Sequence, residues 1–188
     1  MPRIKALTTS EAGEKAQTLL DGVEKKLGKV PNVMRTMAHS PAVLESYLGF
    51  NTAVSKGVLP AKLREQISLV VGESNNCEYC VAAHSALGRL AGLSAEEIAA
   101  SRRGTSPDSK TEAALSFARK IVKERGLVSD DDVASLRLAG YDDGAITEIV
   151  ANVALNIFTN YFNHVAQTDI DFPKASALEA SPERAYSV

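Results

Sequence analysis

Two cysteines and a histidine are the residues whose types and spacing most clearly suggest chemistry. Cys77, Cys80 and His84 lie within eight residues, and these are the chain's two cysteines. On a helix that turns about 100° per residue, the three side chains share one face within about 60°. Residues three apart on a helix have Cα atoms about 5 Å apart, which a disulfide accepts. The spacing therefore predicts a dithiol that closes to a disulfide, with an imidazole one turn away to exchange its proton.

The cysteine pair begins a helix, because the helix-breaking run Ser74-Asn75-Asn76 comes directly before it. Unpaired amides and the helix dipole favour a thiolate at such a position. We therefore expect one cysteine to be a nucleophile and the other a resolving thiol.

A carboxylate is expected opposite the imidazole. If Ser74–Asn76 folds two helices back on each other, Glu65 lies about 12 Å before the turn and His84 about 10 Å after it. Glu65 shares its helical stripe with the small residues Ser68 and Gly72, which permit close approach. A carboxylate there orients the imidazole as a base. The other interpretation is that Glu65 is a solvated surface charge.

Two further interpretations of the cysteine pair stay open. The cysteines could be buried and unreactive. They could also bind zinc together with His84, although structural zinc sites use four ligands, with a second pair elsewhere in the chain. Beyond Cys77 and Cys80 the sequence offers no further cysteine.

The elements that position these residues are expected to be helices, since helical periodicity runs through the chain and strand alternation is nearly absent. We predict an all-α fold of about eight helices, with the Cys-x-x-Cys pair at the start of a central helix. A single domain is expected over residues 1–173, with its redox core at about 60–92 and a C-terminal tail at 174–188. The predicted segments are 10–28, 40–57, 60–74, 77–90, 94–104, 106–126, a short helix from 129, and 142–167, with a short helical turn at 31–39.

Composition excludes several classes of protein. The 188 residues are 45% hydrophobic, which permits a sizeable core, and 21 basic against 23 acidic residues give a net charge of −2. Nucleic-acid and anionic-membrane binders usually carry a basic excess, so neither partner is expected. The chain shows no apolar run of membrane-spanning length and no signal-peptide core, so we expect a cytoplasmic protein. It also shows no haem, flavin or phosphate-loop fingerprint, so no cofactor and no metal are expected.

The last helix carries a polar stripe through an apolar segment. Glu148, Asn152, Asn156, Asn160 and His164 recur every four residues. One interpretation is structural, with the amides bonded to neighbouring backbone or subunits. The other is that His164 reaches the thiol pocket or lines a substrate channel.

The central motif, Glu65 followed by Cys77-Glu-Tyr-Cys80 and His84, resembles the alkylhydroperoxidase AhpD / carboxymuconolactone decarboxylase-like family. Flanking segments such as Val30-Pro-Asn-Val33 and Asp171-Phe-Pro173 look like its longer, peroxidase-related branch, so the resemblance covers most of residues 30–173. It implies an AhpD-like helical fold, antioxidant peroxide reduction, and homo-oligomers, either dimers or trimers and their multiples. By the family pattern Cys80 attacks the peroxide, Cys77 donates a proton and then resolves the sulfenic acid, and Glu65 and His84 form the proton relay.

One position departs from that pattern. Well-characterised members carry a histidine just before the second cysteine, where this chain has Tyr79. Tyrosine, with an ordinary pKa of about 10, is no neutral base near pH 7, but it donates hydrogen bonds. We therefore expect a shorter relay, with Tyr79 and His164 as supporting candidates.

The expected activity is that of a thiol-dependent alkyl hydroperoxide reductase, a peroxiredoxin-type oxidoreductase. Its partners would be a hydroperoxide substrate and an external dithiol reductant, either a protein or a lipoyl-type group. A carboxymuconolactone decarboxylase-type enzyme is one alternative, but it would leave the dithiol without a role. A non-enzymatic metal-binding or redox-sensing module is the other.

Overall fold

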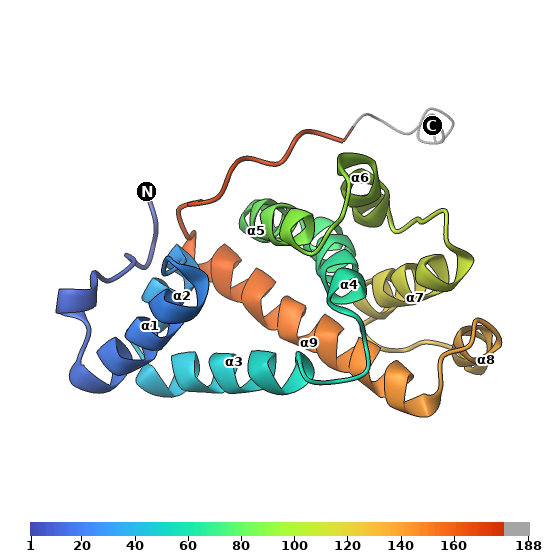
Figure 1. Cartoon of the computed structure of the whole chain (residues 1–188), viewed down its shortest axis with the longest axis horizontal. Coiled ribbons are helices and arrows are strands. Elements are labelled where there is room, and N and C mark those ends of the chain that lie inside the picture. Colours follow the sequence, from blue (N-terminus) through green and yellow to red (C-terminus); the bar gives the residue numbers. More distant parts are fainter. Residues whose placement is uncertain (179–188) are drawn as a thin grey trace.

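The computed structural model describes residues 1–178, and over these residues the chain is made of helices joined by short turns, with no strand. The all-α prediction is confirmed (Figure 1). The described residues hold nine α-helices and one short 3-10 helix, Thr9–Glu11. The α-helices are α1 (Glu14–Leu27), α2 (Asn32–Met37), α3 (Pro41–Val54), α4 (Ala61–Ser74), α5 (Glu78–Leu90), α6 (Ala95–Arg103), α7 (Ser109–Glu124), α8 (Asp130–Leu138) and α9 (Asp143–Ala166).

Local sequence signals set several helix ends. Ser94 and Glu97 form a capping box at α6, in which each side chain accepts a hydrogen bond from the other residue's backbone amide. This arrangement satisfies two of the unpaired amides at the start of the helix. Gly28 ends α1 with a φ of 71°, a left-handed conformation that glycine adopts without steric cost.

The first helix starts later than predicted. The expected helix over residues 10–28 is divided into the 3-10 turn and α1, which begins at Glu14. The Glu11 carboxylate accepts hydrogen bonds from both the backbone amide and the hydroxyl of Thr8. These bonds close a local turn, and the chain is then extended at Ala12 and Gly13 before α1 begins.

The expected count of about eight helices is one too low, because the turn predicted at 31–39 is a helix, α2. Its first backbone amides bond to side chains far along the chain. Asn32 N donates to the Asp171 carboxylate (3.1 Å), and Val33 N donates to the Tyr79 hydroxyl (3.2 Å). The six-residue helix is therefore stabilised by tertiary contacts that local sequence cannot reveal.

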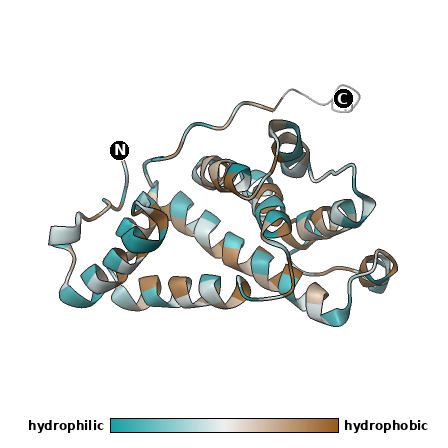
Figure 2. Cartoon of the chain, in the orientation of Figure 1, coloured by the Kyte–Doolittle hydropathy of each residue, from teal (hydrophilic) through white to brown (hydrophobic). Residues whose placement is uncertain are grey.

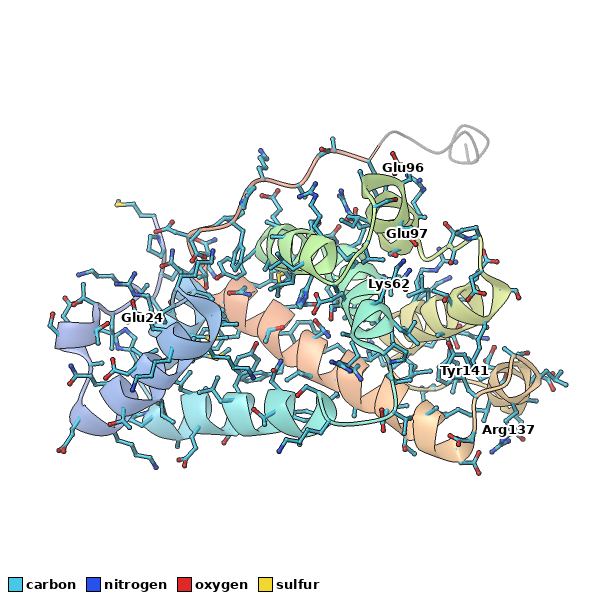
Figure 3. All side chains as sticks on the ribbon, in the orientation of Figure 1. Glu24, Lys62, Glu96, Glu97, Arg137 and Tyr141 are labelled. Atoms are coloured by element: carbon cyan, nitrogen blue, oxygen red, sulfur yellow. A yellow bond between two sulfur atoms is a disulfide. The ribbon has the colours of Figure 1, made fainter. Side chains whose placement is uncertain are left out.

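Helix α4 lies at the centre and packs against α5, α6, α7 and α9 (Figure 1). One apolar cluster joins α4 to α7 and α9, and a second joins α1, α2 and α3 to the beginning of α5. Apolar and polar residues alternate along most helices (Figure 2), as expected for helices that bury one face. The Lys62 ammonium of α4 pairs with the Glu97 carboxylate of α6 at 2.8 Å, and Figure 3 labels both residues.

After α9 the chain continues as an extended segment that crosses above α5 towards α6 (Figure 1). We call residues 168–178 the C-terminal strap. The predicted tail, 174–188, lies partly outside the described residues. No helix within residues 1–178 is both long and apolar enough to span a bilayer.

Candidate active site

Cys77 and Cys80 form a disulfide at the start of α5, with their Cα atoms 5.3 Å apart. Cys77 is the residue that caps the helix, and its sulfur accepts a hydrogen bond from Cys80 N (3.3 Å). Both residues are buried, with 1% and 3% of their surface exposed. The turn before them contains Asn76 with a φ of 54°, a left-handed conformation that asparagine tolerates better than most residues.

Gly72 allows α4 and α5 to approach each other closely at the disulfide. A Cβ atom at this position would lie 3.4 Å from the Cβ of Cys80 and 3.5 Å from Cγ2 of Val81. A methyl group would therefore touch α5, and a larger side chain would push the two helices apart.

The Glu65 carboxylate faces His84 across the two helices, in the position that the hairpin lengths predict. Glu65 Oε2 lies 2.8 Å from His84 Nδ1, and both side chains are about one-fifth exposed. A carboxylate on Nδ1 fixes the ring and leaves Nε2 for proton exchange. The catalytic role assigned to this pair from the sequence remains a prediction.

An apolar pocket of about 250 Å³ leads to Cys80. Its wall comes from four parts of the chain: the α1–α2 region, α3, α5, and α9 together with the strap. His84 borders the same pocket. Its lining residues include Val33, Met34, Tyr47, Tyr79, Ala83, Leu87, Thr159, Asn163, Phe172 and Pro173. An organic molecule that enters this pocket would meet Cys80 and His84 together.

Asn163 is a site residue that the sequence reasoning missed. Its amide Nδ2 lies 3.4 Å from Cys80 Sγ, and only 5% of the residue is exposed. The next residue, His164, was the sequence candidate, but it lies on the exposed side of α9. Its Nε2 contacts Asn76 O at 3.3 Å, and it does not line the apolar pocket.

The spacing of polar residues contained the signal for Asn163. Steps of four residues drift about 40° around a helix each time, whereas a step of four followed by one of three stays on one face. Asn156, Asn160 and Asn163 follow that second pattern and are all buried. A spacing of four residues predicts His164 instead, which lies on the exposed side of α9.

The remaining polar residues of the stripe have the structural role that was one of the two interpretations. Glu148 accepts hydrogen bonds from the backbone amides of Val58 and Leu59. The Asn156 amide donates to the Ser68 hydroxyl (3.0 Å), and Asn160 accepts a hydrogen bond from Asn75 (2.8 Å). These contacts tie α9 to α4 and to the turns that flank α4.

The Tyr79 hydroxyl holds the C-terminal strap. It donates to Asp171 Oδ1 (2.8 Å) and accepts from Val33 N (3.2 Å), while its ring packs edge-on against Phe172. Burial is the main reason that the pKa of Tyr79 is raised, and its hydrogen bond to Asp171 adds to the shift. Tyr79 is thus a neutral donor whose proton is already used by the strap.

Tyr47 of α3 is a second residue that the sequence reasoning missed. It lines the apolar pocket and also a polar pocket of about 120 Å³ that contains Glu65, His84 and Asn156. Burial raises the pKa of Tyr47 to about 12, and the charge of Glu65 contributes to the shift. Tyr47 is therefore a neutral phenol beside the Glu65–His84 pair.

Within residues 1–178 no three side chains from histidine, cysteine, aspartate and glutamate come together in a way that could hold a metal ion. In this structure the sulfur atoms of Cys77 and Cys80 are bonded to each other, and His84 is paired with Glu65.

Comparison with known proteins gives one family match and several structural matches. Residues 41–124 match the model of the carboxymuconolactone decarboxylase family. No curated protein sequence matches the chain significantly.

Among solved structures, the fold is similar to an uncharacterised peroxidase-related protein from Ralstonia eutropha JMP134, described as an alkylhydroperoxidase AhpD core. The TM-score is 0.81 at 26% identity, over 90% of this chain and 92% of that one. An uncharacterised peroxidase-related protein from Silicibacter sp. TM1040 gives a TM-score of 0.78 at 24% identity, covering 88% and 91%. The debrominase Bmp8, as its C82A variant with 2,3,4-tribromopyrrole, gives 0.77 at 22% identity, covering 89% and 91%. The predicted AhpD-like fold is thereby confirmed.

Proposed function

We propose that the chain is a thiol-dependent reductase of organic hydroperoxides, a proposal supported by the match of residues 41–124 to the carboxymuconolactone decarboxylase family and by the AhpD-like fold. One observation carries the proposal. The sulfur of Cys80 lies at an apolar pocket, within 3.4 Å of a buried amide and bonded to a second cysteine. This arrangement combines a nucleophile, a place for an organic substrate and a resolving thiol.

In the oxidative half-reaction the Cys80 thiolate attacks the outer oxygen of the hydroperoxide. The O–O bond breaks, the sulfur keeps the hydroxyl as a sulfenic acid, and the remaining alkoxide takes a proton to leave as an alcohol. Cys77 then attacks the sulfenic sulfur, water leaves, and the disulfide forms. An external dithiol reduces this disulfide back to two thiols and is itself oxidised.

In this mechanism His84 takes the proton of the Cys80 thiol and gives it to the departing alkoxide, a role that the family resemblance assigns to Cys77. Glu65 holds Nδ1 of the ring, so Nε2 is the atom that exchanges the proton. The neutral phenol of Tyr47 borders the same pocket and is available to donate a hydrogen bond. Tyr47 is proposed to take the role of the histidine that well-characterised family members carry at the position of Tyr79.

Asn163 would serve both reactants. Its Nδ2 stabilises negative charge on Cys80. Its Oδ1 is buried and has no hydrogen-bond partner among the described residues. A buried oxygen without a donor is unfavourable, so the O–H of a bound hydroperoxide would supply the missing hydrogen bond.

A decarboxylase of the carboxymuconolactone type is the competing function for this family. That chemistry transfers protons on an acidic lactone and needs no dithiol. The lining of the pocket beside Cys80 is largely apolar, which is unfavourable for an anionic substrate. Both considerations support the peroxidase proposal.

The test is consumption of cumene hydroperoxide with dithiothreitol as reductant, in the wild type and in the Cys80→Ser and Cys77→Ser variants. We expect both variants to lose turnover, and a dimedone adduct to form only in the Cys77→Ser variant, where Cys80 remains. Unchanged turnover in Cys80→Ser would refute the proposal.

The proton relay is tested separately with Glu65→Gln and His84→Gln. Both should move the pH profile of Cys80 alkylation to higher pH, because each weakens the base beside the thiol. Glu97→Gln is the matched control, since Glu97 pairs with Lys62 on the α6 side of α4. An unshifted profile in both relay variants would remove Glu65 and His84 from the mechanism.

A further inference from the structure

The two sulfur atoms of the disulfide belong to residues that line different pockets. Cys80 lines the apolar pocket, whereas Cys77 lines a separate pocket of about 350 Å³, which we call the Cys77 pocket. The Cys77 pocket is lined by Glu73, Asn76, Cys77, Glu78, Val81, Ala82, Arg102, Ile170 and residues 174–177. Neither cysteine lines the other's pocket.

The C-terminal strap runs between the two pockets. Phe172 and Pro173 line the apolar pocket, while Ile170 and Lys174 to Ala177 line the Cys77 pocket. The strap is held near one end by the bond from the Tyr79 hydroxyl to Asp171, and near the other by Arg102 Nη1, which donates to Ser176 O (2.6 Å). Figure 1 shows the strap passing over α5, the helix that begins at the disulfide.

The two pockets also differ in charge. The Cys77 pocket contains two acidic and two basic side chains: Glu73 and Glu78, and Arg102 and Lys174. Arg102 Nε lies 2.8 Å from the Glu73 carboxylate. The apolar pocket is lined mostly by apolar side chains, with Asn163 and His84 as polar groups on the Cys80 side. Its one lysine, Lys29, holds its ammonium over the Phe172 ring (3.7 Å). A thiolate entering from water loses less hydration in the Cys77 pocket.

Because the two cysteines line different pockets, the pocket that the reductant enters decides which sulfur atom it attacks. The attacking thiolate approaches along the S–S axis, opposite the sulfur that leaves, and access decides which sulfur is attacked. A reductant in the Cys77 pocket therefore attacks Cys77. A reductant in the apolar pocket would attack Cys80, from the side where the hydroperoxide also has to bind.

We propose that the two half-reactions use opposite pockets: the hydroperoxide meets Cys80 through the apolar pocket, and the reducing dithiol attacks Cys77 through the Cys77 pocket. The peroxide arm rests on the proposed function, whereas the reductant arm concerns the disulfide alone. The reductant's first thiolate bonds to Cys77 Sγ, the S–S bond breaks, and Cys80 leaves as a thiolate. The reductant's second thiol then attacks its own bonded sulfur, which releases Cys77 and the oxidised, cyclic reductant.

The surroundings of Cys80 favour its release as the leaving thiolate. Cys80 is released beside Asn163 Nδ2 and in the pocket bordered by His84, so its negative charge forms where hydrogen-bond donors already lie. The thiolate that attacks the next hydroperoxide is thus produced directly at the peroxide's own pocket. The spent reductant leaves by the other side.

The first experiment identifies the attacked sulfur without using peroxide. Oxidised wild-type protein is mixed with 2-mercaptoethanol, a monothiol that cannot resolve its own adduct. The reaction is quenched rapidly with acid, free thiols are alkylated, and the adduct is located by fragment mass spectrometry. We expect about tenfold more adduct on Cys77 than on Cys80 at the earliest times. An adduct mainly on Cys80 would overturn the proposal.

The second experiment plugs each pocket with an aromatic side chain. Ala175→Trp narrows the Cys77 pocket, and Leu87→Trp narrows the apolar pocket, where Leu87 is only partly buried. We expect Ala175→Trp to slow disulfide reduction by dithiothreitol about tenfold and to leave the rate of oxidation by cumene hydroperoxide within about twofold. Leu87→Trp should do the reverse. Each variant thus controls for the folding of the other, and Ala86→Phe repeats the apolar plug if Leu87→Trp is poorly folded.

The outcomes separate this inference from the proposed function. Wild-type protein that forms the Cys77 adduct but does not reduce cumene hydroperoxide would refute the peroxidase and support the reductant route. Protein that reduces the hydroperoxide but loses reduction by dithiothreitol in Leu87→Trp, and not in Ala175→Trp, would refute the reductant route alone.

Discussion

The contact between Asn163 and Cys80 makes a quantitative prediction about the reactive thiol. In the Asn163→Leu variant the side chain keeps a similar size but loses the Nδ2 donor that lies 3.4 Å from Cys80 Sγ. Only 5% of Asn163 is exposed, so water does not readily take the place of the missing donor. Because a hydrogen bond to a charged group is worth about 1.5–3 kcal/mol, the Cys80 thiolate should become harder to form by that amount.

That energy corresponds to a shift of about one to two pH units, since one unit equals about 1.4 kcal/mol. The assay is the rate of iodoacetamide alkylation followed from about pH 5 to about pH 10, around the ordinary thiol pKa. It is carried out in the Cys77→Ser background, where Cys80 is the chain's only thiol. The alkylation midpoint of Asn163→Leu should lie at higher pH than that of the parent.

Asn160→Leu is the matched control, because Asn160 is buried on the same helix but bonds to Asn75 rather than to a cysteine sulfur. It should lower stability and leave the alkylation midpoint in place. A midpoint in Asn163→Leu within about 0.3 units of the parent would contradict the reasoning, as would an equal shift in both variants, given that each unit stands for about 1.4 kcal/mol.

Two further perturbations test the packing around the site. Tyr79→Phe removes one buried and one partly buried hydrogen bond and should lower the free energy of unfolding by about 1–3 kcal/mol in urea titrations. The loss should exceed that in Tyr141→Phe, whose hydroxyl makes one hydrogen bond, to Lys110 O. Burial raises the pKa of Tyr79 in the folded state. The neutral hydroxyl therefore contributes fully to the free energy of unfolding below about pH 10, and this contribution is lost as the pH rises further. The wild type should thus lose more stability at alkaline pH than Tyr79→Phe. Gly57→Ala would place a methyl 2.3 Å from the Glu148 carboxylate, displace it from the two amides it caps, and cost about 1 kcal/mol. Gly22→Ala in α1, with nothing within 4 Å, should stabilise by about 0.5–1 kcal/mol, and equal effects at the two glycines would refute this account.

Much of the scaffold could be predicted because its signals are local. Helical periodicity, the Ser94–Glu97 capping box and the stop at Gly28 depend on residues within a turn or two of each other. The meeting of Glu65 with His84 could also be predicted, because one short turn joins two regular helices whose lengths are known. The constant rise per residue of a regular helix allows contacts to be predicted between residues about twenty positions apart.

What could not be predicted depends on contacts between distant segments. The bonds from Asp171 to Tyr79 and Asn32 join residues 92 and 139 positions apart, and no periodicity relates them. Local sequence therefore predicts only a short helical turn where α2 lies. Asn163 was missed for a different reason, because small errors in angle accumulate along a long helix until a neighbouring residue faces the site instead.

The path of α9 has a consequence for how the molecule opens. Its first half, with Ile149 and Val153, belongs to the cluster shared with α4 and α7, and Phe162 near its end packs against the cluster of α1, α2 and α3. One continuous helix therefore packs against both apolar clusters. The buried Asn163 lies beside Cys80 near the end of α9 that packs against the cluster of α1, α2 and α3. Backbone amides in the middle of α9 should be among the slowest in the chain to exchange with deuterium, at rates that report on complete unfolding. Reducing the disulfide should leave that protection intact, so the site would change its chemistry without loosening the helix beneath it.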